Sequence, residues 1–270
     1  MLNGLDNRNA LAQPRELRSM TSRRSGKQYR NPPLQEAICE IYFDAKEPLD
    51  EKRFESLRFD WRDQGFGDQR FVDQKQVNVR LSIQGLETKE IPSDRKLVCR
   101  SDDGSQLIQL TRNMLVVNHL APYPGWADVF RPIVLQRVAE LQTAVPLNGV
   151  KRVGLRYIDR IDIPQAPLEW SDWFNLDFPV PAALKRPGSR LQMRVESPLE
   201  EDLKGIVQIF SAPERKRGHS SVIFDMDVIS SRYLALNEIE VELERVHEPQ
   251  TLAFEEILTD NLRNLFDSDS

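Results

Sequence analysis

Three arginines on one predicted strand are the residues of this sequence best suited to bind a charged ligand. The strand spans residues 150–164, and side chains alternate across a strand, so Arg152, Arg156 and Arg160 share one face. Successive guanidinium groups stand about 13 Å apart at about 3.3 Å of rise per residue. The row can therefore follow an extended anion such as a nucleotide or nucleic-acid phosphate chain, or pair with carboxylates of the same protein. The opposite face is apolar and carries Val153, Leu155, Tyr157, Ile161 and Ile163.

Two pairs of carboxylates bear on that choice. Glu36 and Glu40 lie four residues apart in a predicted strand over residues 36–43, so they would neutralise the arginine row if the two strands were adjacent. Asp225 and Asp227 share a face of a third strand, about 7 Å apart. They can hold a hard cation such as magnesium, pair with arginines, or form a solvated face. Binding of an anion and self-neutralisation both remain open.

Other signatures of catalysis or metal binding are missing from the sequence. The three histidines, His119, His219 and His247, are isolated, and Cys39 and Cys99 have no Cys-x-x-Cys spacing. There is no glycine-rich phosphate loop, Gly-x-Ser-x-Gly turn or His-Glu-x-x-His helix. We therefore expect no cofactor, and we expect both thiols to be buried and structural. A binding protein is the favoured interpretation over an enzyme.

The elements that position these residues form a repeated pattern. Three predicted strands and a long helix occupy residues 76–142, and three more strands followed by helical sequence occupy residues 191–266. The turn at Asp102–Ser105 predicts a hairpin, and Pro132 is expected to kink the helix over 126–142 or mark its first turn. Helical sequence in the second half is expected at 237–247 and 251–266. The pattern predicts an α+β fold of two curved antiparallel β-meanders, each packed on a long helix, and raises the hypothesis of an internal duplication.

Charge divides the chain into an arm and a body. Residues 1–30 hold seven basic and two acidic residues, a balance of +5, so the net charge of −5 leaves −10 on residues 31–270. The arm lacks apolar periodicity and is expected to be disordered. It is expected either to be a solvated extension, in which case Met20 is an alternative translation start, or to contact nucleic acid. The body is expected to comprise a first β/α half at 31–163, a proline-rich crossover at 164–190 and a second β/α half at 191–270.

The crossover also carries the residues most suited to contact a protein. Trp170, Trp173 and Phe174 lie in a connection, and connections usually run over the surface. They are expected either to dock a protein partner or a second copy of the chain, or to fold back onto the body. Arg215, Lys216 and Arg217 form a second basic cluster in a predicted turn, where a solvated tip is the simpler interpretation. No apolar run is long enough for a membrane span or a secretory signal, so we expect a cytoplasmic protein without membrane contact.

Three segments resemble a sporadically distributed family of uncharacterised bacterial proteins of about this length. They are Asn31-Pro32-Pro33-Leu34-Gln35-Glu36-Ala37, Val153-Gly154-Leu155-Arg156-Tyr157-Ile158-Asp159-Arg160-Ile161, and Leu243-Glu244-Arg245-Val246-His247-Glu248. Asp159 stands where the family pattern more often has asparagine. The family's patchy distribution implies horizontally moved genes of the defence or toxin–antitoxin kind, but it supplies no reaction. The leading hypothesis is a non-enzymatic accessory protein that acts through a protein partner, and the alternative is an anion-handling protein or metal-dependent enzyme that uses the arginine row.

Overall fold

A computed structural model of the chain describes residues 27, 29–73, 76–82, 85–91, 95–176 and 190–268, with the backbone alone for 76–91. The basic arm up to residue 26 and residues 177–189 of the predicted crossover lie outside these ranges. At the end of the predicted arm, Lys27 pairs with Asp267, and the ring of Tyr29 packs edge-on against Phe266. The arm's last residues therefore contact the C-terminal part of the body.

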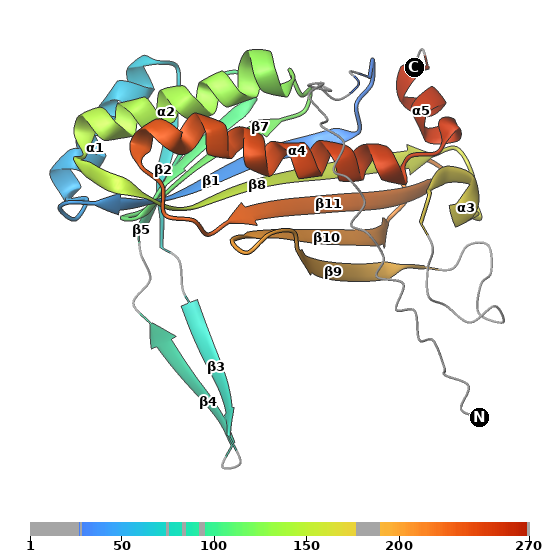
Figure 1. The fold of residues 1–270 in the computed structure, drawn as a ribbon, viewed down its shortest axis with the longest axis horizontal. Coiled ribbons are helices and arrows are strands. Elements are labelled where there is room, and N and C mark those ends of the chain that lie inside the picture. Colours follow the sequence, from blue (N-terminus) through green and yellow to red (C-terminus); the bar gives the residue numbers. More distant parts are fainter. Residues whose placement is uncertain are drawn as a thin grey trace, which may run out of the picture.

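A nine-stranded antiparallel sheet forms the framework of the molecule (Figure 1). Its two central strands are β1 (Leu34–Ala45) and β8 (Leu147–Ile163), which pair along most of their length. The sheet continues outward from β1 through β7 (Met114–Leu120), β6 (Gln106–Leu110), β5 (Arg95–Arg100) and β2 (Asp68–Asp73). It continues from β8 through β11 (Ser220–Ser230), β10 (Leu203–Ala212) and β9 (Gln192–Pro198).

Helices cover one face of this sheet. Helix α1 (Glu51–Asp63) packs on α2 (Arg131–Ala144), and α2 lies on β7. Helix α4 (Ile239–Ile257) lies along β8 and β11, and α5 (Asp260–Asp267) contacts the short α3 (Trp170–Trp173) (Figure 1). The fold is α+β, as the sequence predicted. We call the face beneath the helices the helix face and the opposite face, on which no described helix packs, the open face.

Alternation along the strands fills the core on the helix face. In β8 the side chains of Val153, Leu155, Ile161 and Ile163 are fully buried there, while Arg152, Arg156 and Arg160 point to the open face. Asp50 caps α1 by accepting a hydrogen bond from the backbone amide of Arg53. Pro132 lies in the first turn of α2, directly after a π-helical turn at Trp126–Phe130, so it starts that helix rather than kinking it.

Several predicted elements differ from those observed. The predicted strand at 106–120 is two strands, because the chain turns at residues 111–113 and the Thr111 amide bonds to the Met114 carbonyl. The predicted strand at 76–84 belongs to a separate two-stranded sheet of β3 (Gln76–Ser82) and β4 (Gly85–Ile91). The predicted helix break near residue 249 is wrong: α4 continues through Pro249 because Val246, Gln250 and Ile257 are buried along its length, and the break lies at Leu258–Thr259.

The two halves of the chain share part of their order of elements. In the first, β1 and α1 are followed by β2, β3 and β4, then by the neighbouring strands β5, β6 and β7 and by α2; in the second, β8 and α3 are followed by β9, β10 and β11, then by α4 and α5. Both sets of strands belong to one sheet, joined where β1 pairs with β8. Among the described helices, none has both the length and the apolar composition required to cross a membrane.

Candidate functional site

The open face brings the arginine row and both predicted carboxylate pairs together. Strand β8 lies between β1, which carries Glu36 and Glu40, and β11, which carries Asp225 and Asp227. The register places Glu40 opposite Gly154, and Asp227 opposite Arg156. Residues separated by more than a hundred positions in sequence therefore form one charged area at the centre of the sheet.

Arg156 and Asp225 form the tightest contact of this area. Arg156 Nε donates to Asp225 Oδ1 at 2.7 Å, and Arg156 Nη2 donates to Asp225 Oδ2 at 2.6 Å, a two-pronged ion pair. The Asp225 side chain is 7% exposed and also accepts a hydrogen bond from Gln208. The hydrogen bond to Asp225 raises the pKa of Arg156 above its usual value. Arg156 is therefore held by β11, and not by the glutamates of β1.

The other two arginines of the row also contact carboxylates. Arg152 Nη2 lies 3.5 Å from Glu40 Oε2, and its guanidinium stands 4.8 Å from the centre of the Tyr42 ring. Arg160 Nε donates to Asp162 at 3.2 Å, and its Nη2 donates to the carbonyl of Pro213 and to Ser221 Oγ. Of the two glutamates that lie four residues apart on β1, Glu40 contacts an arginine of the row.

Glu36 does not take part in that pairing. One of its oxygens accepts a hydrogen bond from Asn118 Nδ2 on β7, at 2.7 Å. The glutamate therefore binds the strand on the other side of β1, away from the arginine row. The sequence could not indicate this, because the asparagine lies more than eighty residues away.

Asp227, in the same charged area, is a carboxylate whose charge is only partly compensated. Burial, followed by the nearby charge of Glu40, raises the pKa of Asp227 to about 6, although Arg152 and Arg156 act in the opposite direction. The described residues offer Asp227 no hydrogen-bond donor within bonding distance. A methyl group placed on Gly154 would lie 3.7 Å from Glu40 Cβ and 3.8 Å from both Arg152 Nη2 and Asp227 Oδ1, so the β8 backbone runs beneath these three side chains.

Metal binding finds little support in this geometry. Within the described ranges, no three side chains of histidine, cysteine, aspartate or glutamate converge as a metal site would require. Both oxygens of Asp225 already accept hydrogen bonds from Arg156. Cys39 and Cys99 are buried free thiols, and burial raises the pKa of both, that of Cys99 to about 12.

The three aromatic residues of the predicted crossover lie against the body. Phe174 is 2% exposed and belongs to the core, and its backbone bridges to Leu258 after α4. Trp173 is half-buried; its indole N–H donates to the side chain of Gln165, and its carbonyl accepts from Thr259 Oγ1. Trp170 is also half-buried and packs on Phe174, with ring centres 5.4 Å apart. These contacts fasten α3 to the junction of α4 and α5.

A polar aromatic cluster under the helices was not found from the sequence. The rings of Trp126 and His247 stack with centres 4.3 Å apart, and the indole N–H of Trp126 donates to Glu244. Nearby, the hydroxyls of Tyr123 and Tyr157 are 3.0 Å apart. Burial lowers the pKa of His247 to about 4, so the imidazole is neutral at pH 7. His247 looked isolated because its stacking partner lies more than a hundred residues earlier.

Comparison with known proteins adds no assignment to this geometry. Neither a protein-family model nor a curated protein matches the chain.

Proposed function

We propose that the chain is a non-enzymatic binding protein that acts through a protein partner, and that the partner docks on the open face of the sheet. The observation that carries the proposal is the surplus of negative charge at the centre of that face. Around Gly154 and Arg156, three carboxylates accompany two arginines of the row. The carboxylates are Glu40, Asp225 and Asp227, and the arginines are Arg152 and Arg156.

Apolar side chains lie between these charges. Ile38, Ile158 and Ile223 point to the open face and are half-buried, in rows that alternate with the charged residues. Arginine and apolar side chains are common in the centres of protein interfaces, whereas unpaired charges are depleted there. Because each arginine of the row already contacts a carboxylate, a partner can cover it without burying an isolated cation.

The carboxylate pair of Asp227 and Glu40 indicates the chemistry of the partner. A lysine or arginine placed above Gly154 would relieve the repulsion between the two carboxylates and lower the raised pKa of Asp227. We therefore propose that the partner presents a basic side chain, flanked by apolar residues, to the centre of the sheet.

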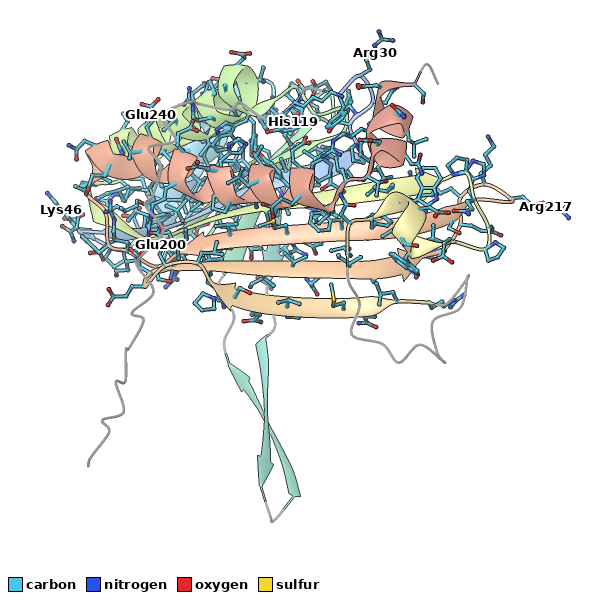
Figure 2. All side chains as sticks on the ribbon, turned by 45° about the vertical axis from the view of Figure 1, so that its right-hand side comes forward. Arg30, Lys46, His119, Glu200, Arg217 and Glu240 are labelled. Atoms are coloured by element: carbon cyan, nitrogen blue, oxygen red, sulfur yellow. The ribbon has the colours of Figure 1, made fainter. Side chains whose placement is uncertain are left out.

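Anion binding is the second candidate, and it has one observation in its favour. At the end of β8 near Arg160, the turn between β10 and β11 carries the exposed Arg215, Lys216 and Arg217. Figure 2 shows Arg217 pointing away from the body. A phosphate chain bound there would bridge this turn and the end of the arginine row, and its affinity would fall steeply as salt concentration rises.

The evolutionary and cellular setting is part of the same proposal. In both halves a strand and a helix precede three neighbouring strands and a long helix, which supports the hypothesis that β1–α2 and β8–α4 arose by internal duplication, with β2, β3 and β4 present in the first half alone among the described elements. The resemblance to a sporadically distributed bacterial family supports a cytoplasmic role in a defence or toxin–antitoxin system. Neither hypothesis depends on the partner's docking position.

Affinity capture with matched variants tests the proposal. Wild-type protein, Asp227→Asn and the control Asp60→Asn, which changes an exposed residue of α1, are each used to capture proteins from cells of the source organism. We expect a protein retained by the wild type and the control but depleted by Asp227→Asn. Titration calorimetry with that protein purified should show affinity about tenfold lower for Asp227→Asn, the equivalent of about 1.4 kcal/mol.

Two outcomes would contradict the proposal. One is a partner that binds Asp227→Asn as tightly as it binds the wild type. The other is salt-sensitive binding of an oligonucleotide that is lost on combined substitution of Arg215 and Arg217 by alanine, which would favour the anion-binding function instead.

A further inference from the structure

Strand β9 ends the nine-stranded sheet and exposes most of its length. Five of its seven residues are exposed, and Val195 at its centre is 45% exposed. One edge of β9 pairs with β10, and no described strand pairs with the other edge. Backbone N–H and C=O groups along such an edge are free to pair with another strand.

The side chains of β9 are arranged so that the strand is complementary to a second copy of itself. If a two-fold axis passes through Val195, antiparallel pairing places Arg194 of one chain opposite Glu196 of the other, and the reverse pair forms by symmetry. Arg194 and Glu196 both point to the open face, because they pair with Gln208 and Ile206 of β10. Directly opposed side chains on paired strands are about 5 Å apart, which is within reach of an ion pair.

The charges at this edge are of both signs, so a second copy of the strand can pair with them. Edge strands are usually shielded by charged side chains, especially lysine, by prolines or by bulges. Here Pro198 lies at the end of the strand, and the central charges have opposite signs. Within the chain, Arg194 Nη2 lies 2.6 Å from Glu196 Oε1, and Lys204 Nζ lies 3.3 Å from Glu196 Oε2. A second copy would extend these contacts into a network of alternating charges.

The helix face near β9 adds apolar surface to the same edge. Val195 points to the helix face, in register with Val207 of β10, but α4 packs on β8 and β11 and leaves Val195 uncovered. Pairing about the two-fold axis would bring the two Val195 side chains together. Contacts between β-branched residues across strands contribute about 0.2–1 kcal/mol.

We propose that the protein forms a symmetric dimer through antiparallel pairing of β9 with β9 of a second copy, which joins two nine-stranded sheets into one of eighteen strands. Only the edges of the two strands meet, so the contact is smaller than the roughly 800 Å² per partner of a typical stable interface, and association is weak and concentration-dependent. The dimer places two open faces side by side. It is independent of the proposed partner-binding function.

Charge exchange at two positions provides a sharp test. In a dimer of Arg194→Glu, residues 194 and 196 of the two copies are both glutamate and face each other. In a dimer of Glu196→Arg, the same two residues are both arginine. Each variant alone therefore places like charges opposite each other. An equal mixture of the two variants pairs glutamates only with arginines and restores complementarity. Arg70→Glu on the exposed part of β2, at the opposite end of the sheet, is the matched control.

Sedimentation velocity over 1–200 µM at low salt measures association. We expect the wild type and Arg70→Glu to dimerise. Each β9 variant alone should remain monomeric up to a concentration at least tenfold above that at which the wild type dimerises. The mixture of the two variants should form a heterodimer. Recovery in the mixture also shows that both variants are folded. Val195→Cys in both chains should cross-link rapidly with a short bis-maleimide, since Cys39 and Cys99 are buried. A wild type that is monomeric at 200 µM, or a dimer unaffected by both single substitutions, would overturn the proposal.

Discussion

Substitution of Asp159 by asparagine is expected to stabilise the protein at neutral pH. Asp159 points to the helix face of β8, is 4% exposed, and has apolar cross-strand neighbours in Leu34 and Phe224. The described residues give its carboxyl group no hydrogen-bond partner. Burial raises the pKa of Asp159 to about 8, so the folded protein holds a proton there at pH 7.

The magnitude follows from the difference between folded and unfolded pKa values. An aspartate in an unfolded chain has a pKa of about 3.9, so keeping Asp159 protonated at pH 7 costs about 4 kcal/mol, at 1.36 kcal/mol per unit. The folded state binds the additional proton. The stability contribution is therefore complete below pH 4, falls as pH rises from about 4 to about 8, and is constant above that. This is opposite in sign to the usual behaviour of an ion-paired carboxylate.

Urea denaturation between pH 4.5 and 8.5 measures this effect. The free energy of unfolding of Asp159→Asn should exceed that of the wild type by about 1 kcal/mol at pH 4.5 and by several kcal/mol at pH 7 to 8. Asp60→Asn on the exposed surface of α1 should follow the wild type within about 0.5 kcal/mol at every pH. If the difference between Asp159→Asn and the wild type does not change with pH, the carboxyl group is solvated or paired and the reasoning is wrong.

Three further predictions concern positions on β8 and α4. Alanine at Gly149 would place its methyl group 2.5 Å from the Leu234 carbonyl oxygen and 2.8 Å from the Tyr233 ring, so Gly149→Ala should lower the free energy of unfolding by about 1–3 kcal/mol. Gly154→Ala, whose nearest neighbour lies at 3.7 Å, should be neutral or slightly stabilising in the same urea titration. His247 has a folded pKa of about 4, below the usual 6.5, so its contribution is present above pH 6.5 and is lost as pH falls toward 4. His247→Phe keeps a ring beside Trp126 and should reduce, by up to about 3 kcal/mol, the loss of unfolding free energy between pH 6.5 and pH 4. If the substitution leaves the pH dependence of that free energy unchanged, the imidazole is not buried as described.

Alternation in the sequence was sufficient to place the arginine row. Period-two patterning separates Val153 and Leu155 from Arg152 and Arg156 whatever the neighbouring strands are, and burial in the structure follows it. The partners of the arginines depend instead on strand order. Arg156 binds Asp225 because β11 is adjacent to β8, and a single sequence contains no direct record of that adjacency.

The helix and strand boundaries predicted from the sequence were wrong at two places, one in α4 and one between β6 and β7. Pro249 is a strong local signal for a helix end, yet α4 extends eight residues beyond it, to Ile257. Gln250, one residue later, donates from its side chain to the carbonyls of Leu155 and Met226 on the sheet, an anchor that no local pattern reveals. The prediction of one strand over 106–120 also missed the turn between β6 and β7, although the polar residues Thr111, Arg112 and Asn113 interrupt the apolar pattern there.

Ionisable groups on the two faces of the sheet have opposite charge states, and this difference is the basis for the proposed position of the partner. On the helix face, burial drives Asp159 and His247 toward their neutral forms, although the charge of Glu244 acts in the opposite direction on His247. On the open face, Arg156 and Asp225 stay charged because they bind each other. Asp227 fits neither pattern: it is too buried for an ordinary surface carboxylate and has too little cationic contact for a complete ion pair. A group in this intermediate state gains most from an external cation, which is why the proposed partner is placed over Asp227 and not over the arginines beside it.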